Sequence, residues 1–161
     1  MAQGRMTAVI DIDGVLADVR HRLHHLHAAA KDWDAFFAAA ADDPLLPEGH
    51  EVATRLAEVY DVVYLSGRPE RYRADTLDWL KQHRLPAGEL LLRPMGDRRP
   101  ARQVKVEVLR RLAEQQPVVV LVDDDPQVLA SARDAGFDVL PADWMAEDAT
   151  LREAQEVEGE T

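Results

Sequence analysis

The chain has 161 residues, of which 47% are hydrophobic and 30% charged, with a net charge of −11 and no cysteine. This length and composition predict one soluble globular domain, and the missing cysteines exclude disulfides, thiolate metal sites and cysteine nucleophiles. The acidic charge argues against nonspecific nucleic-acid binding by the whole surface, and the lack of a long apolar stretch makes a cytoplasmic location without membrane contact the default expectation.

The predicted elements alternate between short aliphatic strands and helices. Strands are expected at 7–12, 62–65, 89–92, 118–122 and 137–140. Helical segments are expected at 17–30, 33–41, 47–60, 70–83, 102–114 and 126–135, the last followed by Gly136 as its C′ residue. This alternation predicts an α/β fold with a mainly parallel sheet that is flanked by helices. The acidic segment 147–161 is expected to be a tail that frays, outside a single domain at 1–146.

Acidic or hydroxyl side chains follow three of the predicted strands. Asp11 and Asp13 end the first strand, Ser66 follows the second, and Asp123 and Asp124 follow the fourth. Right-handed crossovers place the carboxyl ends of parallel strands at one edge of a sheet, where α/β folds bind ligands. Crowded carboxylates repel each other unless a proton or a cation lies between them. The residues alone therefore predict a site at this edge and favour a divalent metal.

These motifs resemble those of the haloacid dehalogenase (HAD) superfamily of phosphatases. The chain has Asp11-Ile12-Asp13-Gly14, then Ser66, then Lys105, then Asp123-Asp124, in the order of that family. The resemblance spans residues 7–144 and implies a Rossmann-like HAD fold with a small cap inserted between the first and second motifs, within residues 15–47. It also implies an Mg²⁺-dependent phosphomonoesterase that works through an aspartyl-phosphate.

The resemblance implies a role for each motif residue. Asp11 is expected to be the nucleophile, and Asp13 the acid that protonates the leaving oxygen and then the base for water. Ser66 and Lys105 are expected to hold the phosphoryl group. Mg²⁺ is expected on Asp11, the main-chain carbonyl of Asp13, and Asp123. For Asp124 two roles stay open, as a metal ligand or as a group that orients Lys105.

A narrower resemblance points to the 3′-phosphatase domain of phage-type polynucleotide kinase/phosphatase. It rests on Gly67-Arg68 directly after Ser66, on Arg22 nine residues after Asp13, and on Gly96-Asp97-Arg98-Arg99 before Lys105. It implies that Arg22, Ser66, Gly67 and Arg68 bind the substrate phosphate, and that the substrate is a 3′-phosphate end of DNA or RNA. Phosphate release from such ends is nucleic-acid repair chemistry, and the resemblance leaves open whether a separate kinase or ligase is a partner.

Two positions depart from the family pattern. Val15 stands where the family usually has Thr, and Ala101 stands where the phage enzyme has an aspartate. No Gly-x-x-x-x-Gly-Lys-Ser/Thr sequence occurs, which argues against 5′-kinase activity in this chain. Two alternative functions remain: a small-molecule HAD phosphatase acting on nucleotides or another phosphometabolite, and, ranked lower, an inactive HAD binding module.

Three further patterns each have two interpretations. Residues 68–111 contain 12 Lys/Arg and 6 Asp/Glu, a local charge of +6 in a chain whose remainder carries −17, which indicates either solvated helix faces or a surface for an anionic substrate. The histidines at 21, 24, 25 and 27 are expected to line the surface or cap rather than hold a metal. The aromatic residues Trp33, Phe36 and Phe37 are spaced for core or cap packing, with a stacking platform for a terminal base as the alternative.

Overall fold

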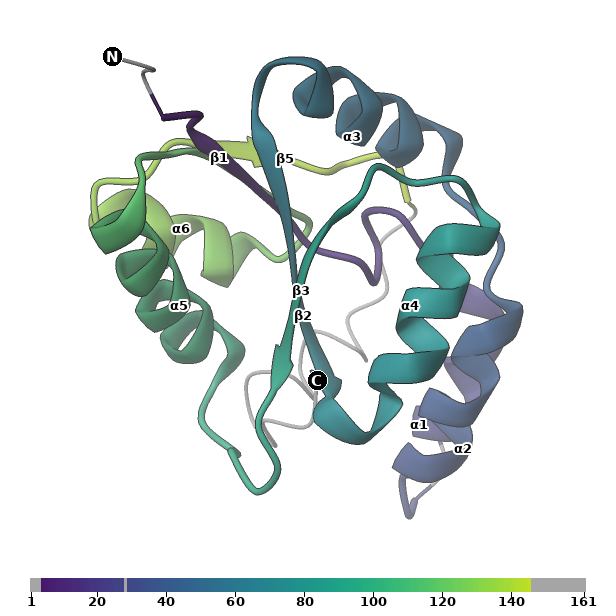
Figure 1. Ribbon diagram of the computed structural model, residues 1–161. Coiled ribbons are helices and arrows are strands. Elements are labelled where there is room, and N and C mark those ends of the chain that lie inside the picture. Colours follow the sequence, from purple (N-terminus) through teal and green to yellow (C-terminus); the bar gives the residue numbers. More distant parts are fainter. Residues whose placement is uncertain (1–3, 28, 146–161) are drawn as a thin grey trace.

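The computed structural model describes residues 4–27 and 29–145. A parallel five-stranded sheet lies at its centre, in the order β3-β2-β1-β4-β5 (Figure 1). The strands are β1 (Thr7–Ile10), β2 (Asp61–Pro69), β3 (Gly88–Arg93), β4 (Val118–Asp123) and β5 (Val139–Pro141). The predicted α/β fold is confirmed. The proposed tail at 147–161 lies outside the described residues.

Helices cover both faces of the sheet. On one face, α3 (Pro47–Val59) and α4 (Arg73–Gln82) pack on alternate strand residues such as Ile10 and Tyr64. On the other face, α5 (Ala101–Gln115) and α6 (Pro126–Asp134) pack on their neighbours Val9 and Val63 (Figure 1). Successive side chains of a strand point to opposite faces, so continuous aliphatic runs are what a sheet covered on both sides requires.

The segment between β1 and α3 forms a small insertion with its own apolar cluster. It contains the 3₁₀ helices η1 (Arg20–Arg22) and η2 (Ala39–Asp42) and the short helices α1 (His24–His27) and α2 (Trp33–Ala38). Five buried side chains form the cluster: Val19, Leu23, Leu26, Phe36 and Phe37. We call this segment, residues 18–46, the cap. It lies within residues 15–47, where the family resemblance predicts a small cap.

Several predicted boundaries were wrong for identifiable reasons. The expected helix at 17–30 begins only at η1, because the amides of Val15, Leu16 and Ala17 all donate to the carbonyl of Ile12 and close a tight turn. The second strand continues to Pro69 rather than ending before Ser66, because it pairs with β3 again at Arg93 after an irregular stretch.

Two residues predicted to mark the ends of helices were confirmed. Pro47 opens α3, and Gly136 follows α6 with φ +92°. Asp125 caps α6 by accepting a hydrogen bond from the amide of Gln127 at 2.9 Å. None of the helices in the described part of the chain combines the length and apolar character that crossing a bilayer requires.

Trp79 of α4 links the core to the base of the cap. Its side chain is 1% exposed, and its indole N–H donates to the main-chain carbonyl of Asp43 at 2.9 Å. We therefore expect Trp79→Ala to lower the free energy of unfolding by about 3–5 kcal/mol, the cost of a large buried cavity. The matched control is Leu77→Ala on the same helix, which is 43% exposed and should change stability by about 0.5 kcal/mol or less. Urea unfolding measures both, and equal effects would contradict this assignment.

Candidate active site

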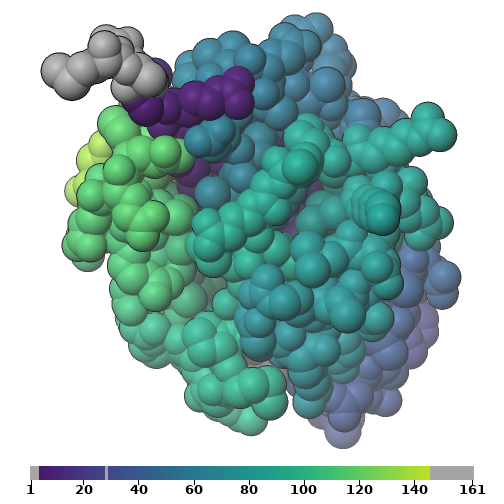
Figure 2. Space-filling model, in the orientation of Figure 1, coloured from purple at the N-terminus to yellow at the C-terminus, as the bar shows by residue number. Residues whose placement is uncertain are grey.

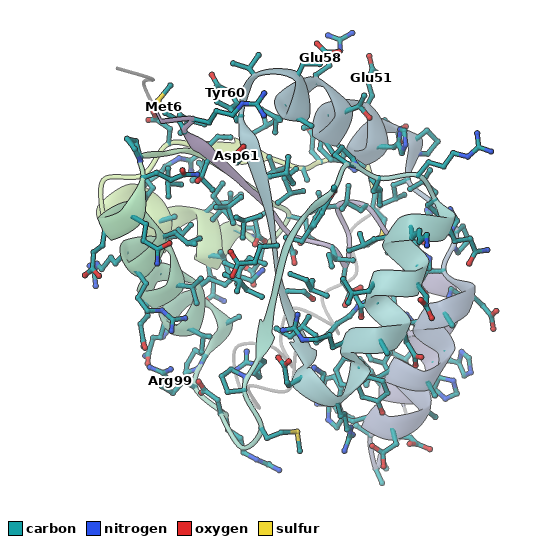
Figure 3. All side chains as sticks on the ribbon, viewed as in Figure 1. Met6, Glu51, Glu58, Tyr60, Asp61 and Arg99 are labelled. Carbon is teal, nitrogen blue, oxygen red and sulfur yellow. The ribbon has the colours of Figure 1, made fainter. Side chains whose placement is uncertain are left out.

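Three adjacent strands deliver chemically active side chains to the carboxyl edge of the sheet. Asp11 directly follows β1, Asp123 ends β4 and Ser66 lies near the end of β2. All three are buried, with Asp123 at 0% exposure. Figure 3 shows Tyr60 and Asp61, at the start of β2, near the opposite end of the molecule from Arg99, which precedes α5. The predicted meeting of strand ends is what the structure shows.

A cluster of three carboxylates and one ammonium group lies at this edge. One oxygen from each of Asp11, Asp123 and Asp124 lies within 4.8 Å of the others. Lys105 reaches the cluster from α5, with its Nζ 2.6 Å from Asp123 Oδ2 and 3.3 Å from Asp11 Oδ1. With all four groups charged, three negative charges face one positive charge. We call these four residues the acidic cluster.

The backbone at Gly14 explains why a glycine follows the first motif. Gly14 has φ +80°, and a Cβ there would lie 2.2 Å from Asp124 Oδ2. Both the left-handed conformation and the close approach of the carboxylate exclude other residues. The glycine thus allows the end of β4 to bring Asp124 against the turn after β1.

Burial and neighbouring charges shift the titration of this cluster. Burial raises the pKa of Asp11 well above its usual value. Lys105 opposes this shift, while the nearby carboxylates of Asp123 and Asp124 add to it. Burial alone would lower the pKa of Lys105, but Asp11 and Asp123 outweigh it and raise that pKa. The ammonium group therefore stays charged, and the carboxylates still carry an excess of negative charge.

This donor set fits a hard divalent cation. All the ligand atoms are carboxylate oxygens, and a cation of charge +2 would balance the excess negative charge of the acidic cluster. Mg²⁺ prefers a few oxygen ligands and keeps water in its remaining positions. The described histidines belong to no comparable group. Instead, the Nε2 of His21 lies 2.6 Å from Asp43 Oδ1.

A second charged cluster surrounds Asp13. Its Oδ1 accepts hydrogen bonds from Arg22 Nη2 at 2.9 Å and from Arg68 Nη2 at 2.6 Å. Both arginines are almost fully buried, at 0% and 1% exposure. Burial raises the pKa of Asp13, but Arg68 and Arg22 outweigh it and hold the pKa at about 2. Asp13 is therefore ionised at neutral pH in this state.

Asp43 completes the second cluster and was missed by the sequence analysis. It is 2% exposed, accepts from Arg22 Nε and Nη2 at 2.8 Å each, and lies 3.3 Å from Arg68 Nη2. Burial raises its pKa, against the opposing effect of Arg22. A buried arginine needs a carboxylate partner, but the cap also contains Asp18, Asp32, Asp34 and Asp42, and no pattern singles out Asp43. We call Asp13, Arg22, Asp43 and Arg68 the arginine cluster.

Ser66 and Gly67 line a small cavity that also reaches Lys105. The cavity has a volume of about 200 Å³. The Oγ of Ser66 accepts a hydrogen bond from the amide of Arg68 at 3.1 Å, which fixes the side chain in the irregular stretch of β2.

Ala101, at the aspartate position of the phage enzyme, is 1% exposed and belongs to the apolar cluster under α5. Val15 is fully buried, and its carbonyl accepts from the indole of Trp144.

The aromatic side chains of the cap pack together, as the packing interpretation predicts. Phe36 and Phe37 are buried, and Trp33 meets Phe36 edge-on at 5.7 Å between ring centroids. The guanidinium of Arg22 lies over the Phe36 ring at 4.2 Å. This contact adds a cation–π attraction to the ion pairs that hold the arginine. The cap is thus joined to the arginine cluster.

A family comparison decides the affiliation of the chain. The family described as the polynucleotide kinase PNKP phosphatase domain, of the HAD type, matches residues 5–143. The chain belongs to this family. It is a HAD-type phosphatase domain, and the family resemblance predicted from its motifs is confirmed. No curated protein sequence matches the chain.

Solved structures share the fold of this phosphatase domain. A chain of the Pnkp1/Rnl/Hen1 RNA repair complex matches with TM-score 0.71 and 23% identity, covering 85% of this chain and 42% of that one. A second structure of the Pnkp1/Rnl/Hen1 complex matches with TM-score 0.73 and 22% identity, over 91% and 49% of the two chains. The HAD hydrolase YfnB from Bacillus subtilis, bound to magnesium, matches with TM-score 0.58 and 11% identity, over 85% and 88%. The present chain therefore spans less than half the length of the two repair-complex chains.

The charge of Asp43 can be tested with an isosteric substitution. Asp43→Asn keeps the shape but leaves Arg22 and Arg68 with one carboxylate instead of two, so both guanidinium groups should shift. We expect hydrolysis of an aryl phosphate to fall about a hundredfold, the usual effect of misplacing a catalytic group by about 1 Å. The variant should also lose about 3–5 kcal/mol of stability, because a buried ion pair is broken.

Asp42→Asn is the matched control, because Asp42 precedes Asp43 and is exposed. Its activity and unfolding midpoint should stay at the wild-type values. An Asp43→Asn protein with unchanged kcat would show that the second carboxylate has no part in positioning the arginines.

Proposed function

We propose that this domain is an Mg²⁺-dependent phosphomonoesterase that removes 3′-phosphates from polynucleotide ends through an aspartyl-phosphate. The proposal rests on one observation: the acidic cluster and the arginine cluster meet at the short turn after β1. Asp11 belongs to the acidic cluster and Asp13 to the arginine cluster. A nucleophile and a proton carrier thus lie two residues apart in opposite electrostatic surroundings. The membership of the chain in the PNKP phosphatase family supports the same chemistry.

The acidic cluster would hold the metal ion. Asp11, Asp123 and Asp124 offer the carboxylate oxygens, together with the main-chain carbonyl of Asp13. The grouping of Asp124 with the other two carboxylates favours a ligand role over a purely orienting one. When bound, Mg²⁺ neutralises charge on the phosphoryl oxygens.

Asp11 would attack the phosphorus atom. An attacking carboxylate must be ionised, and Lys105 Nζ at 3.3 Å from Asp11 Oδ1 favours the ionised form. Lys105 also lines the cavity of Ser66, so its ammonium group and the serine hydroxyl can both bind phosphoryl oxygens. The bond that forms joins Asp11 to phosphorus, and the bond that breaks joins phosphorus to the leaving oxygen.

The protonation state of Asp13 would depend on whether the arginines bind its carboxylate or the substrate phosphate. With Arg22 and Arg68 donating to its carboxylate, its pKa is about 2 and it holds no proton at neutral pH. A phosphate dianion competes for the same guanidinium groups. When the arginines no longer contact Asp13, its burial raises the pKa of the carboxyl group. Asp13 can then protonate the leaving oxygen and later take a proton from the attacking water.

Three observations support a polynucleotide as the substrate. The family is that of the polynucleotide kinase phosphatase domain, and similar folds occur in the Pnkp1/Rnl/Hen1 RNA repair complex. The cap is short, so a protruding strand end has access that a large enclosing lid would deny. We therefore infer that a separate kinase or ligase processes the same ends. We treat residues 1–146 as one catalytic unit, with the cap within 15–47.

A substrate panel tests this proposal. We expect phosphate release to be fastest from a 3′-phosphorylated oligonucleotide, slower from a 3′-phosphorylated mononucleotide and negligible from the 5′-phosphorylated oligonucleotide. Chelation of the metal should abolish all release. A preference for mononucleotides or other metabolites would instead support a small-molecule phosphatase.

Asp11→Asn is the variant that tests the mechanism. It removes the charge and the nucleophilic oxygen but keeps the shape, so turnover should fall at least about 10⁴-fold while the fold persists. Asp18→Asn is its control, because Asp18 lies outside both clusters and pairs with Arg20 at 2.6 Å. Measurable turnover close to wild type in Asp11→Asn would reject the covalent route.

The raised pKa of Asp11 predicts a pH-dependent metal affinity. Protonated Asp11 cannot ligate a metal, so Mg²⁺ must displace a proton below that pKa. We expect the affinity to fall by up to about tenfold per pH unit over the pH range in which Asp11 takes up a proton. Calorimetric titration in two buffers of different ionisation enthalpy measures the released proton. An affinity that is constant over this range, without proton release, would show that Asp11 is ionised before the metal binds.

A further inference from the structure

An open groove lies beside the cavity of Ser66 and has no role in the chemistry described above. Three segments line it: residues 30–34 of the cap, Pro69 and Arg71 after the turn of β2, and residues 93–98 before α5. The groove has a volume of about 590 Å³, within the range of small-ligand sites. In the space-filling view, the cap (blue) and the segment before α5 (green) reach the same end of the molecule (Figure 2).

The groove borders the small cavity that Ser66 and Lys105 line. Arg93, Pro94 and Asp97 line both spaces, and Ser66 and Lys105 line the cavity beyond them. Arg93 is 4% exposed, and its Nη1 donates to the main-chain carbonyls of Asp97 and Arg99 at 3.2 and 2.8 Å. A fixed positive charge therefore lies where the two spaces meet. A ligand whose terminal phosphate is at Ser66 can extend past Arg93 into the groove.

The charges along the groove suit a phosphodiester backbone. Four basic side chains line it: Lys31, Arg71, Arg93 and Arg98. Of its three carboxylates, Asp32 caps α2 by accepting from the amide of Ala35, and Asp97 binds Arg99. The third, Asp34, pairs with Arg71 across the groove, where both side chains are exposed to solvent. An exposed ion pair contributes little stability, so a phosphate can replace Asp34 as the partner of Arg71 at small cost.

One wall of the groove presents a rigid aromatic surface. Trp33 is half-buried and stacks on Phe37, with 5.7 Å between ring centroids and 23° between planes. Phe37 is buried in the apolar cluster of the cap, so the indole is supported from behind. On the segment before α5, Met95 also lines the groove and is 67% exposed. Aromatic rings held in this way stack on nucleobases without regard to sequence.

We infer that this groove binds the single-stranded nucleotides on the 5′ side of the terminal phosphate. One base stacks on Trp33, and the phosphodiesters lie near Lys31, Arg71 and Arg98. The inference rests on the proposed function, because the terminal phosphate must be at Ser66 for the strand to take this path. It assigns the selection of a polymer to the groove, while the arginine cluster binds a terminal phosphate of any kind.

The test compares substrate length with the groove intact and altered. For the wild type, we expect KM to fall about tenfold from a 3′-phosphorylated mononucleotide to the tetranucleotide and then to level off. Lys31→Ala combined with Arg98→Ala should remove most of this gain and leave hydrolysis of the mononucleotide unchanged. The salt dependence of oligonucleotide binding, log Kd against log[salt], should become shallower by about 1.4, since two phosphate contacts are lost.

The control combines Lys81→Ala and Arg110→Ala, which remove the same charge from exposed positions on α4 and α5 outside the groove. This variant should keep the wild-type length dependence and salt slope. Trp33→Leu should raise KM for the tetranucleotide about tenfold, the loss of one stacked base, with the mononucleotide again unaffected. Should Trp33→Leu disturb the cap, the two surface double variants still decide the result.

Two outcomes would overturn the inference. The wild type could hydrolyse mononucleotide and oligonucleotide 3′-phosphates with the same KM, or the groove and control variants could behave alike. A failure of the proposed function looks different, because 3′-phosphorylated oligonucleotides would then not be hydrolysed at all, whether or not mononucleotides are. Fluorescence anisotropy with a 3′-hydroxyl oligonucleotide then tests the groove without turnover. Equal binding by the wild type and the groove double variant would overturn the inference there too.

Discussion

The structure depends on the acidic cluster and the arginine cluster lying side by side at one edge of the sheet. Asp11 and Asp13 leave the same strand, yet one joins an excess of carboxylates and the other lies between two guanidinium groups. Buried charges are costly unless they are compensated. Arg22 and Arg68 compensate Asp13 fully, whereas Lys105 compensates the acidic cluster only in part. Under the proposed function, the uncompensated carboxylates would bind a cation, and the two guanidinium groups would bind the phosphate once it displaces Asp13.

The parallel sheet brings the residues of both clusters together without long connecting segments. Because β1 lies between β2 and β4, residues far apart in sequence reach one another as soon as their strands end. Lys105 approaches from α5 and Arg22 from the cap, so one helical layer and the cap each contribute a cation. The apolar packing of the sheet is thus what holds the charged groups of each cluster close to one another.

Most of the fold could be predicted from the sequence because its signals are local. Aliphatic runs identified all five strands, and residues such as Pro47 and Gly136 marked helix ends. The cap was predicted less well, since its helices are short and its course follows contacts such as the Asp18 amide with the Pro44 carbonyl. Asp43 could not be predicted, because its importance comes from two arginines that approach it from different elements. Patterns along a chain do not show which of several acidic residues a buried guanidinium will select.

The position of Arg22 has a consequence for the movement of the cap. This residue belongs to the cap, binds Asp13 in the turn after β1, and is also the partner of Asp43 near the other end of the cap. Swinging the cap outward would pull the Arg22 guanidinium away from Asp13, a contact that water cannot readily replace in a buried site. Under the proposed mechanism, the incoming phosphate loosens that tie by taking over the same guanidinium. Occupancy of the site and freedom of the cap would then rise together, so the product, rather than thermal motion alone, would help to release the strand.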